Sequence, residues 1–166
     1  MAPAPEAIEC HILNSECRML KARRDSYDGR GNFALTAESD IPKAMEFLGG
    51  RDLYVEEWAS FTLELAVMVV KIEEEPDIDW RTGTLAFPVI ETLHEDSQCK
   101  LCYFPPRNVD EKILLAAREL ARKAVTGFGG RGIFAVEMFL NPGGEILINE
   151  IAPRPHNSGK ASCSES

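Results

Sequence analysis

Basic residues are scarce in this sequence. It has 18 lysines and arginines against 27 aspartates and glutamates, which gives a formal net charge of −9 over 166 residues. A chain with this balance has no broad basic face that could neutralise a phosphate backbone. Nucleic acid is therefore excluded as an expected partner.

Long hydrophobic runs are also missing. The longest apolar stretch, residues 63–70, is interrupted by Glu64 and falls far below the roughly 20 residues that a membrane-spanning helix needs. Residues 1–9 contain prolines and an acid where a signal peptide would have a basic residue and then an apolar run. We therefore expect a soluble, cytoplasmic protein with no membrane partner.

The cysteines are few, odd in number and scattered, which does not indicate a disulfide framework. A reducing, cytosolic compartment fits this pattern best. Two of the cysteines form one C-x-x-C, but a structural zinc site needs a second pair of ligands at suitable spacing. We expect these two to be buried or half-buried thiols in a strand. The cysteines are Cys10, Cys17, Cys99, Cys102 and Cys163, and the histidines are His11, His94 and His156.

Hydropathy patterns divide the chain into a lead-in at residues 1–17, a folded part at 18–159 and a biased tail at 160–166. The folded part mixes strands with two helices, so the expected class is α+β. A charged stretch at residues 73–83 predicts a solvated loop. Strands are predicted at residues 19–23, 32–36, 53–58, 62–71, 85–92, 100–104, 133–140 and 146–151. Helices are predicted after Asp40 up to Gly49, and from Asn108 or Asp110 up to Gly127.

A basic cluster stands out at the turn of the first predicted hairpin. Lys21, Arg23, Arg24 and Arg30 surround a glycine-containing segment at residues 27–31. Glycines let a backbone turn tightly and approach a phosphate, and the flanking cations supply charge. The spacing fits a phosphate-binding turn, but a short basic turn is more often an ordinary exposed loop.

Two glutamates interrupt the apolar strands of the terminal hairpin. If the loop is residues 141–144, Leu140 pairs with Glu145, and Glu150 is the diagonal neighbour of Glu137 on one face. Two such carboxylates suit Mg²⁺ held together with water and a nucleotide phosphate. Asn149 offers a further oxygen, although alternation places it on the other face. The alternative is that both acids lie at strand ends and pair with arginines.

The loop directly after this hairpin, residues 152–159, contains two prolines and several side chains that donate hydrogen bonds. Arg154, His156, Asn157 and Ser158 could hold a small oxyanion there, because the prolines fix the backbone. The alternative is a surface loop whose polarity has no function.

Four motifs follow one another along the chain: Lys21 with residues 27–32, residues 64–68, residues 134–139 and residues 149–159. Together, and in this order, they resemble the 5-(carboxyamino)imidazole ribonucleotide synthase family. That family is also called phosphoribosylaminoimidazole carboxylase where it is fused to a second enzyme. The resemblance runs from Arg18 to Gly159 and is most specific at its C-terminal motif. It implies part of an ATP-grasp fold, with a small lid subdomain and a larger antiparallel-sheet subdomain that enclose ATP.

The resemblance also implies a role for each matching position. Lys21 contacts the phosphates of ATP. The flexible loop over the phosphates and the substrate is formed by Tyr27, Asp28, Gly29, Arg30 and Gly31. The hinge that contacts adenine is formed by Glu56, Glu57, Trp58 and Ala59. Glu64 holds the ribose, Asn149 belongs to the cofactor site, and Glu137 and Glu150 bind Mg²⁺, or alternatively Mn²⁺. Arg154, His156 and Asn157 position bicarbonate or the carboxyphosphate made from it.

The reaction implied is the ATP-dependent carboxylation of aminoimidazole ribonucleotide with bicarbonate, in purine biosynthesis. Both ends depart from the family, which has a preceding domain of roughly a hundred residues and continues beyond Gly159 with a helix and a small domain. We therefore expect a fragment, from a partial gene or a degenerate copy, that self-associates or pairs with a full-length enzyme. The other hypothesis is a non-catalytic module that binds ATP and Mg²⁺.

Overall fold

The computed structural model describes residues 18–26, 30–72, 79–95 and 98–155. The lead-in, the tail, and the site residues Tyr27, Asp28, Gly29, His156 and Asn157 lie outside these ranges. Contacts divide the chain into two compact units. Unit 1 ends at Ala59 and also takes in Gln98, and unit 2 comprises residues 60–95 and those from Cys99 onward.

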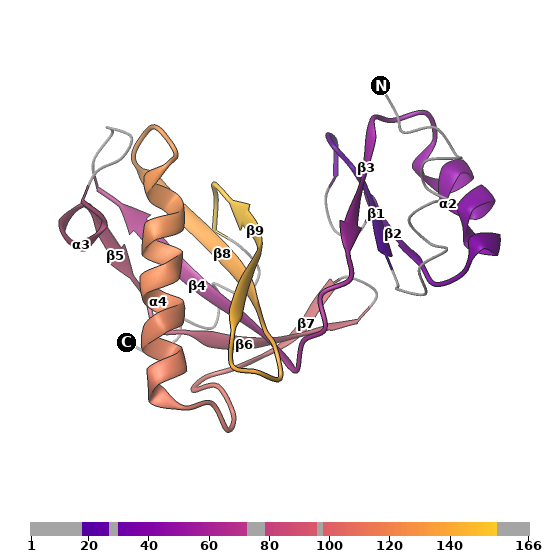
Figure 1. The fold of residues 1–166 in the computed structure, drawn as a ribbon. Coiled ribbons are helices and arrows are strands. Elements are labelled where there is room, and N and C mark those ends of the chain that lie inside the picture. Colours follow the sequence, from indigo (N-terminus) through magenta and orange to yellow (C-terminus); the bar gives the residue numbers. More distant parts are fainter. Residues whose placement is uncertain (1–17, 27–29, 73–78, 96–97, 156–166) are drawn as a thin grey trace. The chain divides into compact units, whose positions relative to one another are not determined.

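Unit 1 is a small antiparallel sheet covered on one face by a helix (Figure 1). Its strands lie in the order β2-β1-β3, and the three strands predicted in this part of the chain are confirmed to within one residue. The helix packs Ile41, Ala44 and Leu48 against Leu20 and Leu35 of the sheet. The elements are β1 (Arg18–Ala22), β2 (Asn32–Leu35), a 3-10 turn η1 (Glu38–Asp40), α2 (Ile41–Leu48) and β3 (Leu53–Glu57).

The helix α2 begins and ends where the sequence predicts, but its first turn is built differently. Gly49 ends the helix in the left-handed conformation at φ 47°, which glycine adopts without a steric penalty. Asp40 precedes the helix, yet its carboxylate makes no capping bond to it. It accepts hydrogen bonds from the N–H groups of Thr36 and Ala37 instead, because the η1 turn folds Asp40 back toward β2.

Unit 2 is built around a six-stranded sheet and one long helix. The sheet order is β7-β6-β4-β8-β9, and β5 also pairs with β4. The central strand β4 runs antiparallel to β8 over nine residue pairs. The elements are β4 (Leu63–Lys71), a short helix α3 (Trp80–Gly83), β5 (Thr84–Ala86), β6 (Ile90–Glu95), β7 (Gln98–Tyr103), α4 (Glu111–Thr126), β8 (Gly132–Leu140) and β9 (Ile146–Ala152).

Two sequence predictions in this unit are wrong in detail. The single strand predicted at residues 85–92 is divided into β5 and β6, because Pro88 has no N–H to donate to a neighbouring strand. The predicted loop at residues 73–83 ends in the helix α3 rather than in coil. Asp79 caps this helix by accepting a hydrogen bond of 2.9 Å from the N–H of Arg81.

None of the helices in the described part of the chain is long and apolar enough to cross a membrane.

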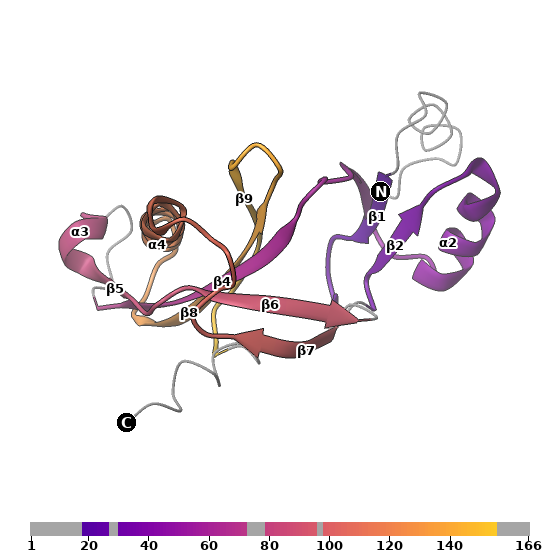
Figure 2. The ribbon, with the colours of Figure 1, turned by 90° about the horizontal axis from the view of Figure 1, so that it is seen from below.

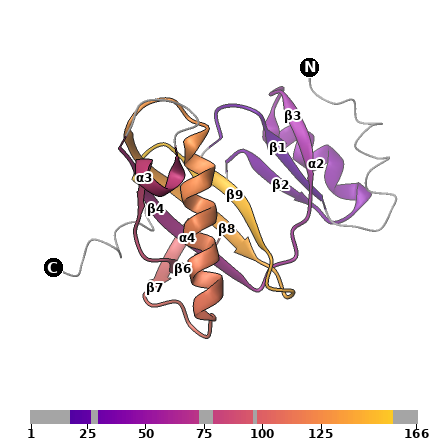
Figure 3. The same cartoon turned by 60° about the vertical axis from the view of Figure 1, so that its left-hand side comes forward.

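The helix α4 covers one face of the unit 2 sheet (Figures 2 and 3). Its N-cap is Asp110, one of the two predicted positions, whose carboxylate accepts from the N–H of Lys112 at 2.8 Å. Leu65, Val67 and Val136 point to the helix and form the core with its alanines. Strand alternation therefore turns the residues next to them in each strand, including Glu64 and Glu137, to the opposite face.

Cys99 and Cys102 lie in β7 as half-buried free thiols, as predicted. Their Sγ atoms are 3.6 Å apart. Burial, and then the contact with Cys102, raise the pKa of Cys99 to about 12. The Cys99 side chain is therefore a protonated thiol at neutral pH.

Candidate nucleotide and metal site

The terminal hairpin brings two carboxylates together through an irregularity in its pairing. Leu140 pairs with Ile146, not with Glu145 as predicted, because Glu145 belongs to the turn and its N–H bonds to the Asn141 side chain at 2.8 Å. The register then shifts between Glu137 and Met138. Glu137 consequently pairs directly with Glu150.

This register shift decides which side chain faces Glu137. Without it Glu137 would pair with Asn149, and Glu150 would lie on the opposite face. The extra residue of a β-bulge changes the alternation of its strand, so Glu150 turns to the same face as Glu137. The predicted shared face is confirmed, although the register is different. Directly opposed residues are also closer, at about 5 Å between Cβ atoms, than the diagonal neighbours that were expected.

The donor set of Glu137 and Glu150 fits a hard divalent cation. Glu137 is buried at 8% exposure, whereas Glu150 is exposed. Two apposed carboxylates repel each other, and a cation between them removes that repulsion. In the described part of the chain no group of three or more His, Cys, Asp or Glu side chains is placed to hold a metal ion. The pair therefore suits Mg²⁺, which takes one or two carboxylates and fills its other positions with water and phosphate oxygens.

A second pair on the same face joins Glu64 of β4 to His94 of β6. Glu64 is opposite Thr92, so His94, two residues on, shares its face. The Nδ1 atom of His94 hydrogen-bonds to the Glu64 carboxylate. This contact is the main cause that raises the pKa of His94, and the charges of Glu137 and Glu150 raise it further. Sequence reasoning missed His94, because its spacing from Glu64 has meaning only once β4 and β6 are known to pair.

The pairing of His94 with Glu64 predicts a pH dependence. A raised histidine pKa stabilises the fold at pH values below the ordinary value of 6.5, and this contribution is lost as the pH rises through the folded-state pKa. We expect an NMR titration to place the His94 pKa above 6.5, and the variant Glu64→Gln to lower it. A His94 pKa at or below the ordinary value in the parent chain would contradict the pairing.

Unit 1 also brings two predicted residues together. Lys21 of β1 and Glu56 of β3 form an ion pair of 2.6 Å between Nζ and Oε2. Both lie on the sheet face away from α2, next to Tyr54, whose pKa is raised by burial and by Glu56. The Lys21 side chain is 16% exposed and that of Glu56 is 42% exposed. Glu56 thus holds the Lys21 ammonium in place on a polar face.

The described part of the basic turn presents its cations to solvent. Arg23, Arg24 and Arg30 are exposed, whereas Gly31 is buried. A Cβ atom at Gly31 would lie 1.7 Å from the Ser26 hydroxyl oxygen, so only glycine fits there. The backbone of Gly31 therefore packs closely against Ser26 at the base of the turn.

The remaining predicted site residues are not brought together by contacts within the described ranges. Glu57 and Trp58 are exposed, and they precede Ala59, the last residue of unit 1 before the chain enters unit 2. Asn149 is half-buried at the register shift of β9. Arg154 is exposed, and its Nη1 donates to the carbonyl of Pro155 at 3.2 Å.

Comparison with known sequences identifies the family of this chain. The profile of the ATP-grasp domain matches residues 7–166, and the chain therefore belongs to the ATP-grasp domain family. The phosphoribosylaminoimidazole carboxylase of Saccharomyces cerevisiae is 46% identical over 162 residues, which are 95% of this chain and 27% of the yeast protein. The N5-carboxyaminoimidazole ribonucleotide synthase of Bacillus subtilis is 38% identical over 141 residues, 85% of this chain and 35% of that protein.

Comparison with solved structures indicates the same family and fold as the sequence relatives do. A carboxyaminoimidazole ribonucleotide synthase from Aspergillus clavatus complexed with ATP superimposes with a TM-score of 0.84 and 47% identity, over 93% of this chain and 39% of that one. The resemblance predicted from the sequence and the partial ATP-grasp fold are thus confirmed. The chain spans between 27% and 39% of the length of these three proteins.

Proposed function

We propose that this chain binds ATP with Mg²⁺ and contributes the nucleotide-binding part of an enzyme that carboxylates aminoimidazole ribonucleotide with bicarbonate. The observation that carries the proposal is the pairing of Glu137 with Glu150 on the face of an ATP-grasp sheet that points away from α4. A solved relative contains ATP, and another contains ADP and 5-aminoimidazole ribonucleotide. Free thiols at Cys99 and Cys102 suit the reducing cytoplasm.

The proposal assigns roles to the residues of each unit separately. Lys21 and the basic turn, which ends in Arg30 and Gly31, bind phosphates, and residues 56–59 take the adenine. Glu64 accepts hydrogen bonds from the ribose hydroxyls, and His94 fixes the direction of the Glu64 carboxylate. Asn149 completes the cofactor site next to Glu150.

The metal and the donors of the last loop serve the transferred phosphoryl group. Glu137 and Glu150 would hold Mg²⁺, which when bound neutralises charge on the phosphate oxygens. Arg154, His156 and Asn157 orient bicarbonate toward that group, and the Arg154 guanidinium stabilises the negative charge that develops there. Proximity accounts for much of such a rate enhancement, so the activity requires the ribonucleotide to be held as firmly as the nucleotide.

Phosphate release distinguishes this enzyme from the second candidate, a non-catalytic module that binds ATP and Mg²⁺. The pairing of Glu137 with Glu150 supports the second candidate as well, because holding a metal with ATP requires no acceptor substrate. Release that requires both bicarbonate and aminoimidazole ribonucleotide, in the chain alone or mixed with a full-length relative lacking its own metal carboxylates, supports the enzyme. Tight binding of ATP with Mg²⁺ and no such release in either assay would leave the binding module.

A further inference from the structure

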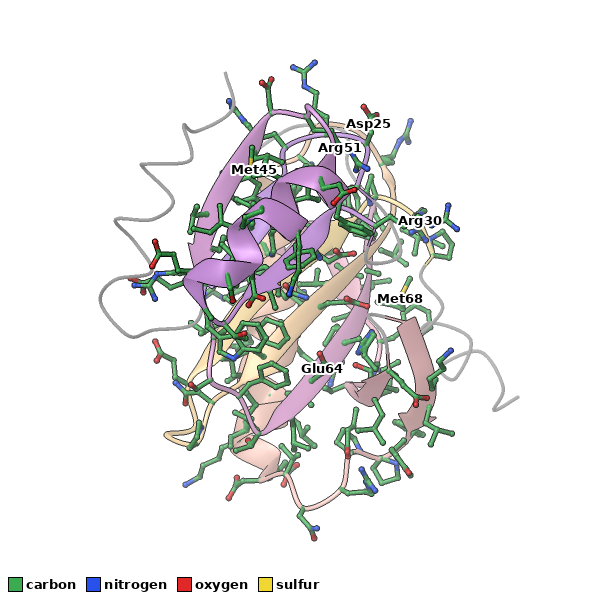
Figure 4. All side chains as sticks on the ribbon, turned by 90° about the vertical axis from the view of Figure 1, so that its right-hand side faces the viewer. Asp25, Arg30, Met45, Arg51, Glu64 and Met68 are labelled. Atoms are coloured by element: carbon green, nitrogen blue, oxygen red, sulfur yellow. The ribbon has the colours of Figure 1, made fainter. Side chains whose placement is uncertain are left out.

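The turn between β1 and β2 is held at its base by a side chain from outside the turn. Arg51 follows the glycines that end α2, and it is half-buried. Its Nη1 atom donates to the carbonyl oxygens of Asp25 at 3.4 Å and Arg30 at 3.2 Å (Figure 4). One guanidinium group therefore ties together two points that lie five residues apart along the turn.

The backbone at one of these two points has an uncommon conformation. Asp25 has a positive φ of 57°, which few non-glycine residues adopt, although aspartate tolerates it better than most. The Ala22 N–H bonds to the carbonyl of Gly31 at 2.7 Å, and the Arg23 N–H bonds to the carbonyl of Asp52 at 2.8 Å. The segment that carries Arg51 thus fixes the turn through both its backbone and its side chain.

The positive charge of Arg51 bears on the role of this residue, because other arginines lie nearby. Arg23, Arg24 and Arg30 already lie in the turn. The Asp52 carboxylate offsets part of the charge of Arg23 and Arg24, but a fourth cation nearby still raises the repulsion among the arginines. A guanidinium carries several N–H donors in a rigid fork, which suits two carbonyl acceptors better than a shorter neutral side chain does. An arginine is favourable where an anion reduces the repulsion, and phosphate groups are such anions.

We propose that Arg51 is a positioning residue for nucleotide phosphates: by bridging Asp25 and Arg30 it sets the backbone that presents Arg30 and Gly31 to the phosphate chain. The inference rests on the proposed function. It assigns Arg51 no contact with ATP itself, so its effect on binding passes through the shape of the turn.

The test compares Arg51→Gln and Arg51→Lys with Lys43→Gln. The control removes one positive charge from α2 of the same unit, where Lys43 is 70% exposed and lies 3.7 Å from Asp40. Calorimetry measures the affinities for ATP with Mg²⁺ and for AMP, which lacks the two terminal phosphates. Limited trypsin digestion without nucleotide measures cleavage after Arg23, Arg24 and Arg30 at a temperature where each variant is folded.

We expect Arg51→Gln to weaken ATP binding about tenfold, the effect of losing hydrogen bonds from a charged donor, and to change AMP binding by less than about twofold. Cleavage in the turn should be faster than in the parent, because the local structure opens more often. Arg51→Lys should keep part of the affinity, and Lys43→Gln should match the parent in both measurements.

Equal losses of ATP and AMP affinity would show a merely structural role and overturn the inference, as would parent-like affinity and cleavage in Arg51→Gln. If Arg51→Gln does not fold, the same comparisons made on Arg51→Lys decide. If the parent chain binds no ATP, the proposed function fails. The digestion then shows by itself whether Arg51 holds the turn, and parent-like cleavage would overturn that role too.

Discussion

Replacing Glu91 with alanine should lower the free energy of unfolding of unit 2 by about 2 kcal/mol, because the buried carboxylate loses its charge-assisted hydrogen bonds with the half-exposed Arg107. Glu91 of β6 is fully buried, with 0% exposure. Its carboxylate accepts hydrogen bonds from the Arg107 backbone N–H at 2.9 Å and from the Arg107 Nε at 3.2 Å. The guanidinium also stacks on the Tyr103 ring, 3.6 Å from its centroid. Glu91 thus anchors the segment between β7 and α4 to the sheet.

Acid should weaken this anchor. Hydrogen bonding to Arg107 is the main cause that lowers the pKa of Glu91 below its ordinary value of 4.5. A lowered carboxyl pKa stabilises the fold above that ordinary value, and the contribution disappears as the pH falls through the folded-state pKa. The difference in stability between the parent and Glu91→Ala should therefore be largest at neutral pH and shrink in acid.

Urea denaturation followed by tryptophan fluorescence measures this difference. The chain has two tryptophans, Trp58 in unit 1 and Trp80 in unit 2, so a Trp58→Phe background reports on unit 2 alone. The exposed acid Glu95 of the same strand provides the control, and Glu95→Ala should change stability by less than about 0.5 kcal/mol. A loss no larger for Glu91→Ala than for Glu95→Ala would contradict the assigned role of the ion pair.

Replacing Glu150 with glutamine should weaken the binding of ATP with Mg²⁺ by about tenfold to a hundredfold, the range seen when a metal site loses supporting groups. The amide keeps the shape of the side chain and removes the charge that attracts the cation. Glu150 is exposed, so the fold should lose little stability, and without metal the variant should even gain some because Glu137 no longer faces a like charge.

A matched control is available in the same hairpin. Glu145 is exposed in the turn, where its backbone N–H bonds to Asn141, and it does not pair with Glu137. Glu145→Gln removes the same charge and should leave the affinity for ATP with Mg²⁺ within about twofold of the parent. If both variants lose affinity equally, the effect is one of net charge, and the assignment of Glu150 to the metal fails.

The elements could be predicted from the sequence because each depends on local pattern. Apolar residues at helical spacing gave α2 and α4, and Asn141 with the following proline and glycines gave the turn of the terminal hairpin. The limits of the single predicted strand at residues 85–92 were missed. There the hydropathy stays high through Pro88, and the interruption comes from a missing backbone donor that hydropathy does not record.

The candidate site was predicted where the residues lie on one hairpin or match a family motif. Glu137 and Glu150 were found because they interrupt apolar strands, although the irregular register that opposes them has no sequence signal that we recognise. His94 and Arg51 were missed because their partners lie 30 residues away for His94 and 21 and 26 residues away for Arg51. Such pairs depend on tertiary structure, which a pattern of spacing does not contain.

The most direct test of the central claim, that the carboxylates Glu137 and Glu150 hold the metal with which this chain binds ATP, is an equilibrium titration with ATP. The titration is made on the parent chain and on the double variant Glu137→Gln/Glu150→Gln, each with Mg²⁺ and with EDTA. We predict that Mg²⁺ strengthens ATP binding by the parent by at least about tenfold and has no effect on the double variant. An equal response to Mg²⁺ in both proteins, or ATP binding by the parent that is the same in EDTA, would contradict the claim.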